Sequence, residues 1–383
     1  MKKEIKLLKF MAKSFIPAIG LTIAVLFMIT PLSCNMDSGE IVIEETDEES
    51  PEIVNHYLLN ENQVKVEFSE PVEIDDYSVE ELMYGLFDIE GLEGNGTKEV
   101  VVTFKNQMTV DRNYIFKGVA ADKHGNSLKF ALRFKAFNGR VPKIVINEIR
   151  NSYQRTLSGT DYKYKFEFVE FYAVTDGNLS GLEFQNASDD KFPKYEFPAV
   201  EVKAGDYIVL HLRMLEPLET CRDEIFGDLT LSTATDSCDT AIDLWVIDGI
   251  TSRIGNSDIL VIRNAMDGSV ADAFVMAVSD LQDWKESFKT LADEVQLSGV
   301  WVDSDGLPSC SVGSAFNSDY ITSSSVTRTI SRQNTLEIPK EGKQVSRASD
   351  FIVTASVGSG ASKVPGDTPG FENSKNKYVK KIM

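Results

Sequence analysis

Hydrophobic and polar residues alternate through much of residues 53–137, which is the pattern of half-buried β-strands. The alternation is clearest in the four segments 64–68, 100–104, 114–119 and 128–134. Gly-rich and Asn-rich stretches separate them, and these residues tolerate the positive φ of tight turns. The pattern therefore predicts an antiparallel β-sandwich over residues 53–137.

A second series of apolar runs begins after a short linker at residues 138–143 and continues to residue 373. Its main members are residues 144–149, 166–172, 202–210 and 258–263. One segment alone has helical spacing, with apolar side chains at Leu281, Trp284, Phe288 and Leu291. We therefore predict an all-β protein with two Ig-like β-sandwiches in tandem and one short helix in the second.

Residues 53–137 resemble the bacterial Ig-like domain of S-layer and surface-adhesion proteins. The matching pieces are Phe-Ser-Glu-Pro-Val at 68–72 and Gly-Val-Ala-Ala-Asp at 118–122, followed by Gly-Asn-Ser-Leu at 125–128. The resemblance implies a spacer or presenting module and brings no catalytic residues with it.

Residues 144–373 resemble the lamin tail domain, another Ig-like sandwich. The matching segments are Ile-Asn-Glu-Ile at 146–149, Phe-Val-Glu-Phe-Tyr at 168–172, Ala-Gly-Asp-Tyr at 204–207 and the ending Thr-Pro-Gly-Phe at 368–371. In this resemblance Gly-Asn-Ser-Asp at 255–258 stands at the turn of a strand pair. Residues 213–241 and 276–330 are insertions relative to the compact family form, and the second contains the helical segment. Binding specificity is expected in such insertions, because loops on a β scaffold commonly carry function.

The first 33 residues have the pattern of an export signal, a basic start followed by about nineteen apolar residues. Cys34 follows directly after Ser33, and this boundary resembles the relaxed lipobox of spirochaete and Bacteroidetes lipoproteins. The resemblance implies cleavage before Cys34 and acylation of its thiol. An uncleaved membrane helix and plain secretion are the alternatives, and in each case the remaining chain lies outside the cytoplasm.

Residues 34–52 are acidic and lack aromatic residues, so we expect an extended tether. The chain as a whole has a formal charge of −20. Beyond its basic start, the few clustered lysines lie in a basic tail at residues 374–383 that we expect to be frayed. Phosphate binding requires clustered cations, so we expect no nucleic-acid partner.

Three cysteines remain beyond Cys34. Cys221 and Cys238 lie in the first insertion, and in an oxidising exterior we predict a disulfide between them. Cys310 is then a buried free thiol, or it replaces one of the two in the bridge.

Candidate catalytic and metal-binding residues are sparse. The three histidines, His56, His124 and His211, are far apart in sequence, and we expect each in a turn or at the surface. Asp303 and Asp305 begin a calcium-like loop, but Ser314 stands where the bidentate Glu is needed, so we expect a turn. Glu148 and Glu170 lie on predicted strands, and we expect them to be partly buried hydrogen-bond acceptors.

These features predict a lipid-anchored, non-catalytic surface protein of the cell envelope, in the outer membrane, at the cell surface or in the periplasm. It would bind the membrane through Cys34 and an unidentified protein or glycan through its loops, without cofactor or metal. The alternative is a non-catalytic accessory subunit of an extracellular hydrolase system.

Overall fold

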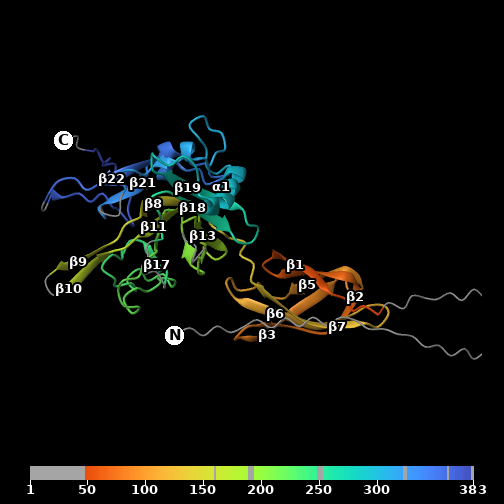
Figure 1. The fold of residues 1–383 in the computed structure, drawn as a ribbon. Helices are drawn as coiled ribbons and strands as arrows, with labels where there is room; N and C mark the ends of the chain where they lie inside the picture. The colour runs from red at the N-terminus through yellow and green to blue at the C-terminus, as the bar shows by residue number, and fades with distance from the viewer. Residues whose placement is uncertain are drawn as a thin grey trace, which may run out of the picture. The chain divides into compact units, whose positions relative to one another are not determined.

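The fold is known from a computed structural model (Figure 1). It describes residues 48–158, 161–188, 194–247, 253–321, 326–359 and 362–380. The predicted signal segment, Cys34 and most of the tether lie outside these residues. Within the described residues the protein is all-β with one short α-helix, as the sequence predicts.

The first sandwich, over residues 53–135, has seven strands. They are β1 (Ile53–Asn60), β2 (Gln63–Glu81), β3 (Gly85–Phe87), β4 (Ile89–Glu93), β5 (Thr97–Phe104), β6 (Asn113–Ala121) and β7 (Ser127–Lys135). The four segments with the clearest alternation became parts of β2, β5, β6 and β7, and every pairing is antiparallel.

The long strand β2 organises this sandwich. Its first half pairs with β1 and β5, whereas its second half, from Glu73 onward, pairs with β6 and β3. The strand therefore passes from one sheet to the other at a corner, which is a common way to close a sandwich. Its inward side chains, including Val64, Val66 and Phe68, are buried in one core with Phe116.

The second sandwich is built from two larger sheets. One has the strand order β17 (Ile242–Trp245), β16 (Tyr207–His211), β11 (Phe168–Ala173), β8 (Ile144–Arg150), β21 (Arg328–Arg332) and β22 (Phe351–Ala355). The other has the order β14 (Tyr195–Glu196), β13 (Leu182–Asn186), β18 (Asp258–Asn264), β19 (Val270–Ala277) and β20 (Phe316–Asn317). Two short pairs complete the second sandwich, β9 (Gln154–Ser158) with β10 (Asp161–Lys165) and β12 (Gly177–Asn178) with β15 (Glu201–Val202).

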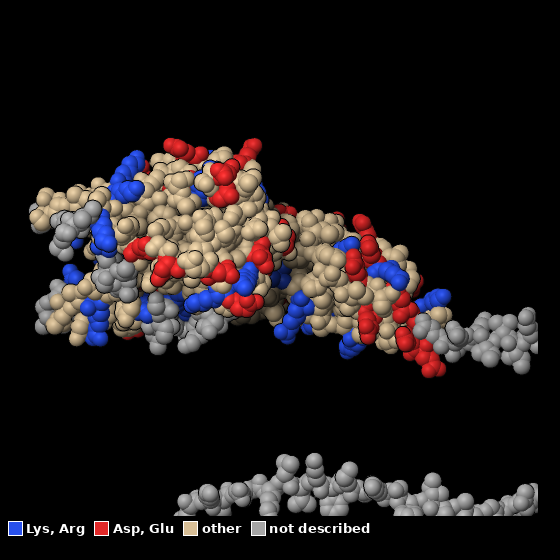
Figure 2. All heavy atoms as spheres, turned by 45° about the horizontal axis from the view of Figure 1, so that its top comes forward, with Lys and Arg blue, Asp and Glu red and all other residues tan. Residues whose placement is uncertain are grey.

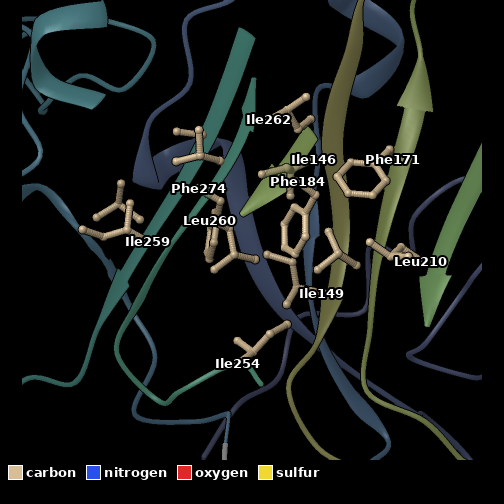
Figure 3. Close-up of a cluster of buried hydrophobic side chains, with 14 of the residues drawn as sticks. Ile146, Ile149, Phe171, Phe184, Leu210, Ile254, Ile259, Leu260, Ile262 and Phe274 are labelled. Atoms are coloured by element: carbon tan, nitrogen blue, oxygen red, sulfur yellow. The ribbon is translucent and has the colours of Figure 1, made fainter. Parts of the chain in front are cut away.

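The facing sides of these two sheets form one hydrophobic core (Figure 3). Ile146, Phe171 and Leu210 come from the six-stranded sheet, and Leu260 and Phe274 come from the five-stranded sheet. Burial of such side chains supplies the main driving force for the packing of the two sheets.

The helix α1 (Glu286–Ser298) covers the outer face of the five-stranded sheet. Four consecutive residues of β18, 259–262, are fully buried, and neighbouring strand residues point to opposite faces. Phe288, Leu291 and Val295 of α1 are buried, and the helix contacts β18 and β19. The helix begins later than the helical spacing suggested, so Leu281 and Trp284 precede it.

Three details of the sequence interpretation are wrong. The turn between β18 and β19 lies at residues 265–269, whereas residues 255–257 precede β18 and Asp258 is its first residue. The second insertion ends before residue 330, because Ile330 belongs to β21 and to the core. The basic tail is not frayed as far as Tyr378, whose N–H donates to the Val353 carbonyl of β22.

The linker between the sandwiches is bound to the second one. The Asn138 side chain donates to the carbonyls of Asn178 and Ser180, at 2.8 and 2.6 Å, and the carbonyl of Arg140 accepts from the Asn178 N–H. A fragment designed to contain the second sandwich alone should therefore begin at Asn138 and include the linker.

We expect fragments 51–137 and 138–380 each to fold alone, because the two hydrophobic cores share no residue. Each should give a β-type circular dichroism spectrum and its own cooperative urea transition. A fragment that lacks a cooperative transition would show that the predicted boundary does not separate two folding units.

Candidate functional site

Glu148 and Glu170 lie side by side. They are directly opposite in the antiparallel pairing of β8 and β11, and both are fully buried. Because Ile149, Val169 and Phe171 point into the core, the two carboxylates lie on the other face of the six-stranded sheet. Directly opposed side chains in such a pair have Cβ atoms about 5 Å apart.

The C-terminal segment 366–373 closes over this pair. The Thr368 N–H donates to Glu148 Oε2 at 3.0 Å, and the Gly370 N–H donates to Glu170 Oε2 at 2.6 Å. The hydroxyls of Thr329 and Ser331 also donate to Glu148, and Asn147 Nδ2 donates to Glu170 Oε1 at 2.6 Å. The Thr-Pro-Gly ending noted in the sequence therefore has a physical role, since its N–H groups cap the two carboxylates.

Burial makes both carboxyls hard to ionise. It raises the pKa of Glu148 to about 7, against the opposing effect of hydrogen bonds from Thr329, Thr368 and Ser331. Burial, and then the negative charge of Glu148, raises the pKa of Glu170 well above its ordinary value. A perturbed carboxyl pair can mark an active site, but a catalytic carboxylate must also reach its substrate. These two have their oxygens occupied by the chain itself, in the structural role that the sequence suggested.

The predicted disulfide between Cys221 and Cys238 is not formed, and Cys310 is also a free thiol. Cys221 packs in a cluster with Phe166 and Trp245, whereas Cys238 Sγ lies 3.1 Å from the Pro369 carbonyl beneath the C-terminal segment. The insertion thus directs the two sulfurs into different clusters. Burial raises the pKa of the Cys221 thiol to about 11 and that of Cys310 to about 12.

The remaining candidates are also placed by the structure. Asp303 closes its own turn by accepting from the N–H groups of Asp305 and Leu307, both at 2.9 Å. His124 lies in the turn between β6 and β7, but His211 is buried, contrary to expectation. Its Nε2 is 2.7 Å from Asp243 Oδ1, and its ring stacks on Trp245 with centroids 3.9 Å apart.

A cleft that the sequence did not reveal opens beside Trp245, with a volume of about 350 Å³. Phe184 and Tyr195 line it from β13 and β14, and Trp245 lines it from β17. Since β14 and β17 are edge strands of the two sheets, the cleft lies where the sandwich is open along one side. Asp223, from the first insertion, lines it as well.

The first insertion both seals the edge of β17 and builds this cleft. Asp223 Oδ1 accepts from the Trp245 N–H at 2.7 Å, and Glu224 Oε2 accepts from the Asp243 N–H at 2.9 Å. Two successive carboxylates thus occupy outward N–H groups of an edge strand, which would otherwise be open to pairing with another chain. Burial raises the pKa of Glu224 to about 7 and raises the pKa of Asp223 from its ordinary value.

The cleft residues come from segments far apart in the chain, so no local motif pointed to them. The available signals were the aromatic residue in the run Ile-Asp-Leu-Trp-Val at 242–246 and the acidic pair at 223–224. Both signals become informative only when β14 and β17 are placed beside each other.

In the described part of the chain, no cluster of three or more His, Cys, Asp or Glu residues is arranged to hold a metal ion. Within the same residues, no helix is long and apolar enough to cross a bilayer.

Comparison with known proteins gives one family match and several distant similarities. A family model named TP_1001_2nd, with the description "protein second domain", matches residues 142–353. A stretch of 176 residues, 45% of this chain, is 30% identical to an uncharacterized protein of Treponema pallidum (strain Nichols). The match spans 42% of that protein's length.

Two solved structures are distantly similar. The N-terminal part of the bacterial S-layer protein SbsC is 13% identical, with a TM-score of 0.23, over 61% of this chain and 45% of that one. A DUF4876 family protein from Bacteroides thetaiotaomicron VPI-5482 is 12% identical, with a TM-score of 0.24, over 69% and 84% of the two chains. The resemblances to bacterial Ig-like and lamin tail domains stay predictions, whereas the β-sandwich architecture that they imply is present.

Proposed function

The chain belongs to the family defined by the TP_1001_2nd second domain, and for this member we propose a role as a lipid-anchored, non-catalytic binding protein of the cell envelope. In this role acylated Cys34 holds the chain at a membrane, the acidic segment 34–52 acts as a tether, and the second sandwich binds a ligand.

The cleft beside Trp245 is the observation that carries the binding role. Ligand sites are concave, mostly apolar, and contain a few polar groups that set orientation. This cleft has aromatic walls from Phe184, Tyr195 and Trp245. Its charged lining residues are Lys194, Glu196, Asp223 and Arg253. His211 stacks on Trp245 and thereby fixes one wall.

The arrangement of acidic groups supports a non-catalytic role. Glu148 and Glu170 are the paired carboxylates of the second sandwich that the sequence singled out, and the segment 366–373 separates them from solvent. On the face shown in Figure 2, Lys and Arg side chains are dispersed among Asp and Glu side chains instead of forming a basic patch. Such a surface offers little to phosphate backbones, in line with the proposal that nucleic acid is not a partner.

Replacing Cys34 with alanine is expected to abolish acylation. Cells that express wild-type protein in the presence of an alkyne palmitate analogue should incorporate the label, and the protein should partition into the detergent phase. Cys34→Ala should lose both properties, because the thiol is the acyl acceptor.

Cys238→Ala is the matched control, because it removes another thiol and should label like the wild type. Undiminished labelling of Cys34→Ala, or loss of labelling in Cys238→Ala alone, would contradict the anchor.

A further inference from the structure

Strand β7 is an open edge of the first sandwich. It pairs with β6 on one side, and among the described residues no backbone hydrogen bond reaches its other side. The strand is nine residues long, whereas proteins usually keep exposed edge strands very short or interrupt them with a proline or a bulge. Residues 127–135 contain no proline, and their pairing with β6 has no bulge. The outward N–H and C=O groups of β7 are therefore available to another strand.

The exposed face of β7 carries positive charge only. Lys129, Arg133 and Lys135 lie on this face, and residues 127–135 contain no Asp or Glu, although the chain as a whole has a charge of −20. Lys135 forms an ion pair with Asp111, but within the described structure no carboxylate pairs with Lys129 or Arg133. Complementary charge selects the partner at such a surface, so this edge favours an acidic one.

The opposite face of β7 offers apolar surface at the rim of the core. Phe130 and Phe134 are buried in the first core, whereas Leu128 and Leu132 pack against it and stay half-buried. Neighbouring strands share the same two faces, so an added strand would place its side chains alternately beside these leucines and beside the cations. The edge therefore suits a strand in which acidic and apolar residues alternate.

A second copy of β7 does not meet these requirements. Pairing two β7 strands edge to edge would bring the cations of both copies onto one face, and like charges on directly opposed residues destabilise a strand pair. Cations on an edge strand thus oppose self-association while they leave the edge open to a strand of opposite charge.

We propose that β7 binds an extended segment of another protein, with alternating acidic and apolar side chains, as an additional strand of its sheet. The backbone of this segment pairs with the open edge, its carboxylates contact Lys129 and Arg133, and its apolar side chains cover Leu128 and Leu132. The first sandwich then has a binding surface of its own, in addition to the cleft of the second sandwich.

Isothermal titration of the full-length protein in dodecyl maltoside with the end-blocked peptide Glu-Val-Glu-Val-Glu-Val-Glu tests the proposal. We expect saturable binding. A peptide with proline in place of each valine keeps the charge but loses those backbone N–H donors, so it should bind at least about tenfold more weakly. A peptide with lysine in place of each glutamate should be weaker by at least about as much, because its charge repels the strand. Absence of saturable binding, or equal binding of either analogue, would overturn the proposal.

Amide hydrogen exchange locates the bound peptide. About half of the N–H groups of an open edge strand point away from its one neighbour and exchange readily. The glutamate peptide should slow exchange within residues 127–135 and leave the edge strand β4 unchanged. Binding without any change in β7 would refute the assignment. Full protection of β7 before any peptide is added would show that a second copy already occupies the edge, and would refute it as well.

Charge reversal on β7 provides the matched variant. Lys129→Glu combined with Arg133→Glu should weaken binding of the glutamate peptide about tenfold or more, because like charges then face each other. The same variant should bind the lysine peptide better than the wild type does, a gain that a folding defect cannot produce. Lys163→Glu combined with Lys340→Glu, both exposed in the second sandwich, changes the net charge equally and should bind like the wild type. Unchanged binding in the β7 variant, or an equal loss in the control, would contradict the site.

Discussion

Replacing Arg332 with methionine should destabilise the second sandwich by about 3–5 kcal/mol, the usual cost of removing one partner from a buried ion pair. Arg332 on β21 and Asp272 on β19 are both fully buried, and Arg332 Nη2 lies 3.0 Å from Asp272 Oδ2. The pair joins the two sheets, because Asp272 also accepts from the Ile146 N–H of β8 at 2.9 Å. Without the guanidinium, Asp272 is left in the core with its charge unbalanced.

Urea unfolding followed by tryptophan fluorescence measures this effect cleanly. All three tryptophans, Trp245, Trp284 and Trp301, lie in the second sandwich, so the signal reports on that sandwich alone. Lys289→Met, which breaks the exposed pair of Lys289 with Glu286, is the control and should cost at most about 1 kcal/mol. Adding Asp272→Asn to Arg332→Met should recover part of the loss, because the unbalanced charge is then gone. If Arg332→Met lowers the free energy of unfolding no more than Lys289→Met does, the pair of Arg332 with Asp272 does not hold the two sheets together.

Lowering the pH from 8 to 5.5 should stabilise the second sandwich, against the common behaviour of proteins in acid. The folded state raises the pKa of Glu148 and Glu224 to about 7 and that of Asp258 to about 6, and also raises the pKa of Glu170. A carboxyl with a raised folded pKa binds more protons in the folded than in the unfolded chain. Stability is therefore gained as the pH falls from about 7 toward 4.5 and is lost as it rises again.

The size of this effect follows from the shift of one carboxyl. Moving a pKa from 4.5 to about 7 corresponds to roughly 3 kcal/mol at pH 8, since each pKa unit is worth about 1.4 kcal/mol. Glu148→Gln should flatten the pH dependence between pH 5.5 and 8, because it removes one titrating group while keeping an acceptor for Thr368. Glu341→Gln, on an exposed loop, should leave the dependence unchanged. Greater stability at pH 8 than at pH 5.5 in the wild type would contradict the expected sign.

Much of the fold was predictable from local sequence patterns. Alternation located β2, β5, β6 and β7, and apolar runs located β8, β11, β16 and β18, because a half-buried strand imposes its period directly on the sequence. The helix was found for the same reason, although its first turn was misplaced by several residues. Turn positions were less certain, and the turn between β18 and β19 was misplaced, since several Gly-containing segments fit equally well.

Contacts between side chains were far less predictable from the sequence. The sequence marked Glu148 and Glu170 as carboxylates on strands, but not that they are opposed or capped by residues 366–373. Glu148 and Thr368 are separated by 220 positions, and no local period records such a contact. The ion pair of Asp272 with Arg332 was hidden for the same reason, although Asp272, the single charged residue of the apolar strand β19, was a usable signal.

What the sequence alone determined is the all-β architecture and the residues that carry its strands, because burial on one face of a sheet dictates local alternation. What only the tertiary structure decided is which polar groups meet. Cys221 and Cys238 share one insertion yet point into different clusters, and Asp223, Tyr195 and Trp245 form a cleft only because two edge strands lie side by side. Those outcomes depend on how distant strands pack against each other, which the hydrophobic pattern of each strand does not specify.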